Sequence, residues 1–281
     1  MSPSIDIGAF KVWSLPDGAA NLPTWAMHPD LDGGDPVQWG HYAQRSPAGF
    51  HGESHQWRIH NTCFLVEGDG ERVLVDLGVG VGPYPWYQGI RGTLLERMRE
   101  AGFEPASVTQ VFLTHAHPDH VGWAFDEEHG VPRFPNARYR LHRKDWHFFA
   151  DRETVPKHFT RFVEPLAKSG LLDMLDGEAD IAPGMTALET PGHTAGHMSL
   201  LIRSQGEGLV IAGDVLNSPM YVTEPHRPFG SDADQQLGIE TRVRLVDRIA
   251  AEGWHVGAAH FPEPGWGAVV VEQGRRWWRG G

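Results

Sequence analysis

Cysteine is almost absent from this sequence, which has a single one, Cys63, in 281 residues. One cysteine excludes an internal disulfide and any metal site built from a cysteine cluster. The chain also lacks an apolar run of about 18 residues, so we expect no transmembrane helix and no membrane partner. The N-terminus has neither a basic start nor an apolar stretch typical of a signal peptide, which predicts a cytoplasmic protein.

Basic residues are few relative to acidic ones: 24 Lys and Arg stand against 36 Asp and Glu, a formal net charge of −12. Binding to a phosphate backbone depends on clustered Lys and Arg, so we expect no nucleic-acid partner. Apolar residues make up 40% of the chain, which is ample for a sizeable core. No repeat or flexible linker divides the sequence, and we predict one domain over residues 1–281.

Strand and helix signals are clearest after residue 56. Predicted strands cover 9–15, 57–67, 72–77, 110–114, 139–142, 185–190, 198–203, 208–212, 255–258 and 268–271, and predicted helices cover 94–101, 144–150, 157–169 and 234–252. This order predicts an α/β layered domain and not a helical bundle or a Greek-key sandwich. Residues 16–56 lack periodicity, and we interpret them as an extended N-terminal arm, either a lid or the contact of a homodimer.

Histidine is the residue in excess, with 17 copies, roughly three times the number expected from average usage. The most informative segment is 110–122, where a short apolar strand runs directly into the sequence HAHPDH at 115–120. Three imidazoles and a carboxylate packed so closely are costly to hold together unless a cation compensates. Imidazole and carboxylate ligands suit zinc and related divalent metals.

Three further short apolar strands are each followed by one His or Asp just beyond the carboxyl end of the strand. Open α/β sheets place their ligand crevices at that edge, so we expect these side chains to meet the histidine-rich segment. The predicted metal ligands are His115, His117, Asp119, His120, His193, Asp214 and His260. These exceed what one tetrahedral metal uses and match two divalent ions about 3.5–4 Å apart. We expect zinc first, with Mn²⁺, Co²⁺ and Fe²⁺ as alternatives.

The order H-x-H-x-D-H, then a lone His, an Asp and a final His, resembles that of the metallo-β-lactamase fold hydrolases. The segment LVDLG at 74–78 is similar to the early Asp-x-Gly turn of that fold, and the resemblance covers residues 57–272. Three further segments resemble the branch that holds quorum-quenching lactonases and methyl-parathion-hydrolase-like enzymes. They are FPNAR at 134–138, PGHTAGH at 191–197 and HFPEPG at 260–265.

The resemblance implies a four-layer αββα sandwich with its site at one edge. It also implies a division of the ligands, with His115, His117 and His193 on one metal, Asp119, His120 and His260 on the other, and Asp214 between them. Asp76 would not bind metal itself but would orient the loop that carries the metal ligands. We expect His197 to have such a supporting role too, and Trp123 to line the pocket.

These ligands predict a hydrolase that acts on a small-molecule lactone, ester or phosphotriester through a metal-bridging hydroxide. Asp119 would in addition pass a proton to the departing oxygen. Several lactonases of this type have a Tyr three positions after the bridging Asp, where this sequence has Asn217; the nearest tyrosine is Tyr221. Either Asn217 assists the substrate carbonyl, Tyr221 reaches in, or the substrate is not a homoserine lactone.

Two other activities of the same fold stay open. One is a mononuclear iron dioxygenase of the persulfide dioxygenase type, and the other is a thioesterase of the glyoxalase II type. The dioxygenases use fewer ligands at the second site, and the presence of both Asp119 and His120 disfavours that alternative. Metal analysis distinguishes them, because the hydrolase would hold two equivalents per chain and the dioxygenase one iron.

Overall fold

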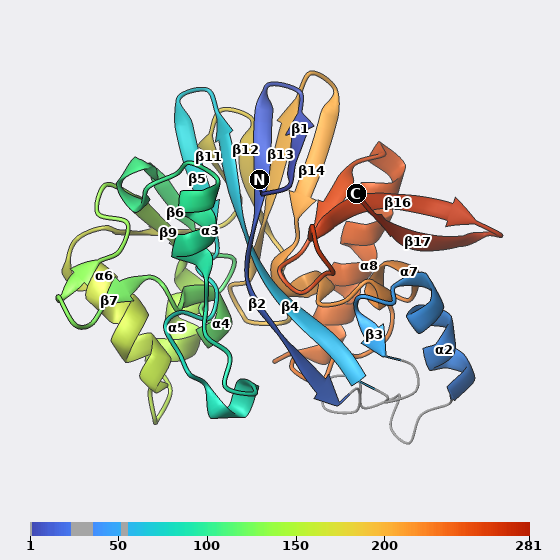
Figure 1. Ribbon diagram of the computed structural model, residues 1–281, viewed down its shortest axis with the longest axis horizontal. Helices are drawn as coiled ribbons and strands as arrows, with labels where there is room; N and C mark the ends of the chain where they lie inside the picture. The colour runs from blue at the N-terminus through green and yellow to red at the C-terminus, as the bar shows by residue number, and fades with distance from the viewer. Residues whose placement is uncertain (1, 24–35, 52–55) are drawn as a thin grey trace.

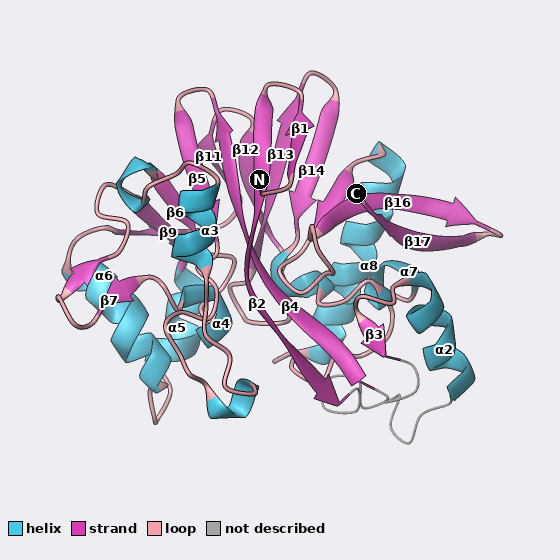
Figure 2. Cartoon of the chain, in the orientation of Figure 1, coloured by secondary structure: helices cyan, strands magenta, loops and turns pink. Residues whose placement is uncertain are grey.

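Two β-sheets lie face to face at the centre of the molecule, with helices on both outer sides (Figures 1 and 2). The computed structural model describes residues 2–23, 36–51 and 56–281. The first sheet has the order β1 (Ser4–Ile7), β2 (Phe10–Pro23), β4 (Gln56–Gly68), β5 (Glu71–Val75), β6 (Gln110–Phe112), β9 (Arg138–His142) and β10 (Leu172–Leu175), with β3 (Phe50–His51) paired to β4. The second has the order β11 (Ala179–Ala182), β12 (Met185–Glu189), β13 (Met198–Ser204), β14 (Glu207–Ile211), β15 (His255–Gly257), β16 (Trp266–Glu272) and β17 (Arg275–Gly280).

The helices fall into two groups, one for each sheet. On the side of the first sheet lie α3 (Leu94–Glu100), α4 (Pro118–Val121), α5 (Arg143–Ala150) and α6 (Glu164–Lys168), together with the small ribbon of β7 (Phe125–Asp126) and β8 (Val131–Pro132). On the side of the second lie α2 (Pro36–Arg45), α7 (Met220–Thr223) and α8 (Gln235–Glu252). No helix among the described residues is long and apolar enough to cross a membrane.

Three clusters of buried apolar side chains separate the layers. The central cluster joins β4, β5 and β6 to β12, β13 and β14, and Phe64 and Leu200 belong to it. A second cluster fills the space between the first sheet and helices α3, α5 and α6. A third lies between the second sheet and helices α7 and α8. The order of layers is therefore α, β, β, α, which confirms the predicted sandwich.

The long helix α8 shows why the clearest sequence signals were reliable. The Asp234 carboxylate accepts the backbone N–H of Leu237 at 3.0 Å, and Gly253 ends the helix in the left-handed region at φ 66°.

Strands β10, β11 and β17 were not predicted. In β17 the sequence RRWWRG carries three arginines, and as an edge strand it needs no second buried face.

The prediction for residues 16–56 was wrong about their local structure. Residues 16–23 continue β2, which pairs with β4 as far as Pro23 opposite Gln56. Helix α2 packs on its own chain, where the Arg45 guanidinium lies 4.0 Å from the centre of the Trp277 ring. Residues 24–35 and 52–55 of the predicted arm lie outside the described residues. A lid or dimer contact here stays a prediction, which size-exclusion chromatography of a 24–35 deletion would test.

Asp17 explains why residues 16–23, with two prolines and one glycine, enter the sheet. Its buried carboxylate accepts the backbone N–H of Val79 at 2.6 Å, the backbone N–H of Leu94 at 2.7 Å and the indole N–H of Trp123 at 2.9 Å. The approach is so close that a Cβ at Gly78, where φ is +50°, would stand 2.1 Å from Asp17 Oδ2. One carboxylate thus joins β2 to the loop after β5 and to the start of α3.

Asp17→Asn should destabilise the protein by about 2 kcal/mol. The amide group of asparagine has one oxygen in place of two, so its own N–H groups would face at least one of the N–H groups that now donate to Asp17. Urea unfolding followed by circular dichroism measures the change. The exposed control Asp69→Asn should leave the midpoint unaltered. An equal midpoint for Asp17→Asn and the wild type would contradict this role.

Candidate active site

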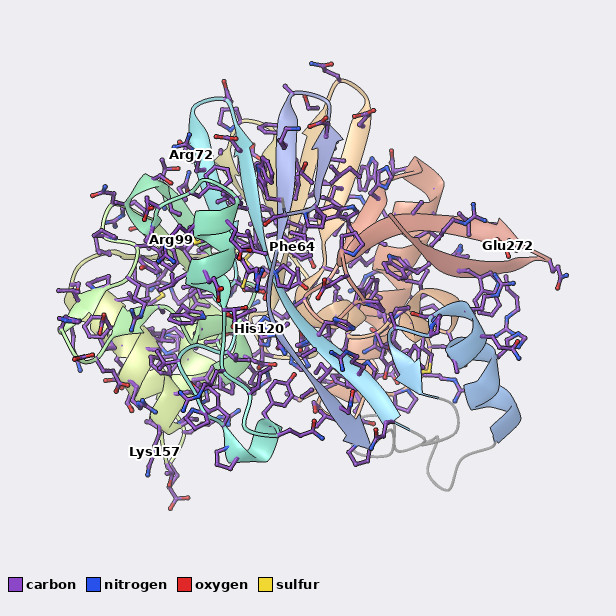
Figure 3. The ribbon with its side chains drawn as sticks, in the orientation of Figure 1. Phe64, Arg72, Arg99, His120, Lys157 and Glu272 are labelled. Atoms are coloured by element: carbon purple, nitrogen blue, oxygen red, sulfur yellow. The ribbon has the colours of Figure 1, made fainter. Side chains whose placement is uncertain are left out.

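The predicted ligands follow strands that end at one edge of the sandwich. β5 and β6 are parallel, β14 and β15 are parallel, and β12 is antiparallel to β13, which is antiparallel to β14. The carboxyl ends of these strands therefore share an edge within each sheet. In Figure 3 His120 lies near the middle of the molecule, between the two helical layers. All seven predicted ligand residues meet here in three overlapping groups that are able to hold a metal ion.

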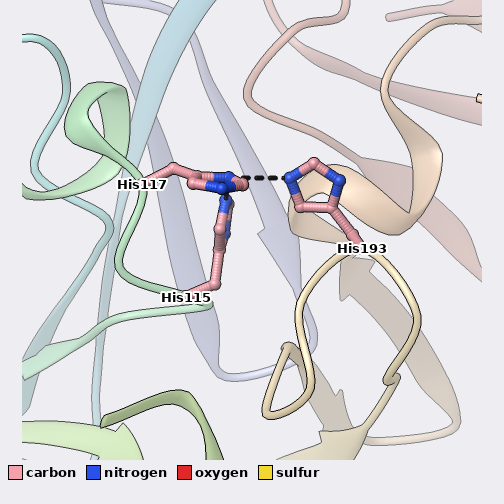
Figure 4. A group of neighbouring side chains, drawn as sticks. All are labelled: His115, His117 and His193. Atoms are coloured by element: carbon pink, nitrogen blue, oxygen red, sulfur yellow. Dashed lines mark hydrogen bonds between the residues drawn. The ribbon is translucent and has the colours of Figure 1, made fainter. Parts of the chain in front are cut away.

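Three histidines form the first group (Figure 4). Nδ1 of His117 lies 2.9 Å from Nε2 of His115 and 2.9 Å from Nε2 of His193. Burial, together with the neighbouring histidines, lowers the pKa of His115 and of His117 well below its usual value, so both rings are neutral. Neutral imidazole nitrogens that converge on one point are the donors that zinc takes.

Asp214 lies between this group and a second one. Its Oδ1 is 3.2 Å from Nε2 of His120 and 3.2 Å from Nε2 of His260, and its Oδ2 is 3.4 Å from Nε2 of His193. Asp119 completes the second group, with Oδ2 3.6 Å from Nε2 of His260. Burial opposes ionisation of Asp214, but the adjacent His260 and His120 hold its pKa well below the usual value.

Two buried atoms of this cluster have no hydrogen-bond partner in the described part of the chain. They are Nε2 of His120 and Oδ1 of Asp214, 3.2 Å apart but not in hydrogen-bonding geometry. A buried acceptor and a buried ring nitrogen without partners cost free energy unless another group satisfies them. A divalent cation would satisfy both, so the donor set fits metal ions.

Oxygen atoms hold the outer ring nitrogens of these histidines. Asp76 Oδ2 lies 2.8 Å from Nδ1 of His120, and Asp76 also accepts the backbone N–H of Thr114 at 2.8 Å. His260 Nδ1 donates to the backbone carbonyl of His60 at 2.6 Å. A proton held on Nδ1 leaves the Nε2 lone pair facing the site. The predicted orienting position of Asp76 is thus present in the structure.

His193 is held by a buried ion pair that the sequence did not suggest. Its Nδ1 lies 3.3 Å from Oδ1 of Asp232, whose Oδ2 accepts from Arg242 at 2.7 Å. Asp232 lies in a loop and Arg242 on α8, and no spacing in the sequence connects either of them to His193. The pair joins the long helix to the ligand loop.

Asp145 on α5 connects two ligand loops and was also missed. It accepts the backbone N–H of Ala116 at 2.7 Å and the hydroxyl of Thr194, so it touches neighbours of three ligands. Burial raises the pKa of the Asp145 carboxyl to about 6. A Cβ at Gly196 would stand 2.2 Å from the Asp145 backbone nitrogen, which explains the glycine there. An acidic residue on a helix face carries no local signal of such a role.

His197 supports Asp214, as expected. Its Nε2 accepts the backbone N–H of Asp214 at 3.0 Å, and its Nδ1 lies 2.9 Å from the hydroxyl of Thr190. Burial lowers the pKa of His197 from 6.5 to about 3. The ring is therefore neutral in the folded protein.

This depressed pKa predicts that the metal-free protein loses stability in acid. Above pH 6.5 His197 is neutral in the folded and the unfolded chain, and its contribution is fully present. As the pH falls below 6.5 only the unfolded chain takes up the proton, so by pH 5 the free energy of unfolding should drop by about 2 kcal/mol from this group. Urea unfolding at pH 8 and pH 5, with His197→Asn for comparison, measures this share; equal pH dependence in both proteins would contradict it.

A cavity of about 340 Å³ opens beside the cluster. Its lining residues are Leu22, Ile59, Tyr87, His117, Pro118, Asp119, His193, Asp214, Asn217, Ser231 and His260. Leu22 and Ile59 come from the ends of β2 and β4, so the segment predicted as an arm supplies part of the wall. Tyr87, which the sequence analysis did not single out, also lies at the cavity, and burial raises the pKa of its phenol well above the usual value.

The residues predicted on the substrate side lie in different places. Asn217 lines the cavity, and its Nδ2 donates to Oδ2 of Asp214 at 3.1 Å. The Tyr221 hydroxyl donates to the backbone carbonyl of Pro228 at 3.0 Å, and the Tyr221 side chain is not part of the cavity wall. The expectation that Trp123 lines the pocket was wrong, because its indole N–H is held by Asp17 within the core.

Comparison with known proteins places this site in a family. The sequence profile of the metallo-beta-lactamase superfamily matches residues 57–248. The chain belongs to this superfamily. An N-acyl homoserine lactonase of Bacillus cereus is 26% identical over 205 residues, covering 68% of this chain and 76% of the relative. N-acyl homoserine lactonase AttM of Rhizobium radiobacter is 32% identical over 54% of this chain and 63% of its own length.

Solved structures agree on the fold. AidC, a dizinc quorum-quenching lactonase in complex with a product, has a TM-score of 0.82 at 22% identity and covers 100% of this chain and 97% of its own. The hydrolase AbOPH has a TM-score of 0.82 at 24% identity, covering 99% of this chain and 96% of its own. The predicted fold, the resemblance to the quorum-quenching lactonase branch and the prediction of a metal-dependent hydrolase are confirmed.

Proposed function

We propose that this chain is a dinuclear zinc hydrolase that opens small lactones, with N-acyl homoserine lactones as the first class to test and aryl esters or phosphotriesters as the second. The observation that supports this most is the position of Asp214. One carboxylate lies within 3.4 Å of ring nitrogens from two separate ligand groups, beside a cavity with apolar walls. The homoserine lactonase relatives make lactones the first choice of substrate.

The ligands divide into two sets that share Asp214. His115, His117 and His193 would hold one ion, and Asp119, His120 and His260 the other. Two divalent ions bound there would make a water molecule acidic enough to act as a nucleophile near neutral pH.

The chain's own residues bind and orient the substrate. Leu22 and Ile59 offer an apolar wall for an acyl chain, and Asn217 holds one oxygen of Asp214 in place. Asp119 lines the same cavity, where its carboxylate would take up the proton that the attacking water molecule loses and pass it to the alcohol oxygen that departs when the ring opens.

Asp119→Asn should therefore lower kcat by about 10²-fold, because an amide neither takes up nor releases a proton near neutral pH. Lactone turnover followed with a pH indicator gives the rate, and mass spectrometry of the metals shows whether binding is intact. Unchanged turnover with full metal content would exclude the proton-transfer role.

The direct test loads the protein with zinc, manganese, cobalt or iron and assays N-hexanoyl homoserine lactone, an aryl ester, paraoxon, an acyl thioester and a persulfide. We expect two metal equivalents per chain and the fastest turnover on the lactone. Full activity after removal of all metal would overturn the proposal. One iron per chain with oxidation of a persulfide would support the dioxygenase instead, and preferential cleavage of the thioester would support the glyoxalase II type.

A further inference from the structure

Ala116 lies between two of the candidate metal ligands, His115 and His117, and side chains from elsewhere in the fold bind both of its backbone polar groups. Its N–H donates to Oδ2 of Asp145 at 2.7 Å, and its carbonyl oxygen lies 3.1 Å from Nε2 of His158. Since a carbonyl oxygen only accepts hydrogen bonds, Nε2 of His158 carries the proton of this bond. Neither the predicted ligand set nor the proposed mechanism uses His158.

Asp145 and His158 come from two segments that pack against each other. Asp145 lies in the first turn of α5, and the half-buried His158 directly precedes the π-helical turn Phe159–Val163. The rings of Phe149 on α5 and of Phe159 stack with their centres 5.7 Å apart and their planes at 16°. Both segments therefore reach the loop that carries the ligands as parts of one packed unit.

Phe149 also contacts the ring of a ligand in this loop. The centre of its ring lies 5.4 Å from that of His117 and 5.6 Å from that of His158, and both contacts are edge to face. Such contacts favour one orientation of the two rings. The segment that binds the backbone of Ala116 thus also restricts the side chain of the next residue.

We propose that Asp145 and His158 together fix the backbone of Ala116 and thereby position the ligands on either side of it. The backbone between His115 and His117 sets where their side chains begin, and their ring nitrogens, Nε2 and Nδ1, lie 2.9 Å apart. A metal ion binds tightly only when its ligands are held in such a convergent arrangement. His158 acts through Ala116 and is a positioning residue for the ion of the first ligand group.

The second ligand group is supported by other residues. Nδ1 of His120 lies 2.8 Å from Oδ2 of Asp76, and Nδ1 of His260 donates to the backbone carbonyl of His60 at 2.6 Å. Neither contact involves α5 or His158. Loss of the hydrogen bond from His158 should therefore weaken the first ion more than the second.

This inference rests on the two-ion centre of the proposed function, and His158→Leu tests it because leucine has bulk but no N–H group. In a His260→Ala background, which keeps the three histidines of the first group, His158→Leu should lower zinc affinity by about 10–100-fold. In a His193→Ala background, which keeps the second group, the affinity should change much less. Competition with a chromophoric chelator measures both affinities without any turnover.

Two further variants separate positioning from general stability. His158→Gln keeps an N–H donor at a similar reach and should restore most of the affinity. His147→Leu, the matched control, removes an exposed histidine of α5 and should leave both affinities unaltered. Equal losses in the two backgrounds, no loss in the His260→Ala background, or no recovery with glutamine would each overturn the inference.

Hydrogen exchange of the metal-free protein distinguishes this inference from the proposed function. The backbone amides of Ala116 and His117 should exchange faster in His158→Leu than in the wild type, because the peptide group between them has lost its partner. If the wild type binds no zinc, the proposed centre fails, and this exchange alone decides the role of His158. If the wild type binds two zinc ions but the exchange rates are equal, only the role of His158 is overturned.

Discussion

Asp214→Ala is expected to abolish most of the activity, lowering kcat/KM on a lactone by on the order of 10³-fold or more. Among the described residues, Asp214 is the one carboxylate whose oxygens lie near histidines of both ligand groups, within 3.2 Å of His120 and His260 and 3.4 Å of His193. Its removal leaves each group with three nitrogen or oxygen donors at best and takes away the negative charge between them. Metal content should fall below two equivalents per chain.

The control for Asp214→Ala is Asp247→Asn, an exposed carboxylate on α8 that pairs with Arg276. It should retain wild-type activity and metal content. Metal-binding isotherms measured by competition with a chromophoric chelator report the loss directly, independent of turnover. If Asp214→Ala kept two tightly bound ions and wild-type kcat/KM, the site would not be built around this residue.

Arg242→Met should destabilise the protein by about 3–5 kcal/mol, the largest stability effect that we expect. The guanidinium is buried on α8, where it donates to Asp232 at 2.7 Å and to the carbonyls of Val215 and Arg227 at 2.9 and 2.8 Å. Methionine fills a similar volume but removes the cationic partner of the buried Asp232 carboxylate. Since Asp232 contacts His193, metal affinity should decrease as well.

A double-mutant comparison isolates the ion pair from the lost packing. Combining Arg242→Met with Asp232→Asn removes the carboxylate that has lost its cationic partner. The double variant should therefore lose less stability than the sum of the two single variants. The matched control is Arg244→Met, two residues further along α8 on its exposed side. It should change the unfolding midpoint little. Additive effects of the two buried changes would show that the pair does not act as a unit.

Local patterns in the sequence were enough to predict the ligands, because each follows a short apolar strand by a few residues. His115 stands three residues beyond the end of β6, and Asp214 stands three residues beyond the end of β14. Strands that end at the same edge of a sheet bring the residues that follow them together, whatever the conformation of the loops between the strands. The alternation of strands and helices predicted a layered α/β domain, and the resemblance to the family supplied the four-layer order.

Contacts between distant segments could not be predicted from any pattern. Asp145, Asp232 and Arg242 hold ligand loops, but each contacts residues 10 to 49 positions away through a loop or a helix whose direction depends on packing. The extension of β2 to Pro23 was missed because residues 16–23 have no strand pattern of their own and are stabilised by Asp17 and by pairing with β4.

The amino-acid sequence by itself determined the layered fold and which His and Asp residues gather at one edge of it, since both depend on short-range order along the chain. Only the tertiary structure decided which tyrosine reaches the cavity, placing Tyr87 there and turning Tyr221 to Pro228. The physical reason is that a side chain's surroundings depend on loops folded over the sheet edge, and hydrogen bonds such as that from Asn61 to Tyr87 form only when those loops are packed.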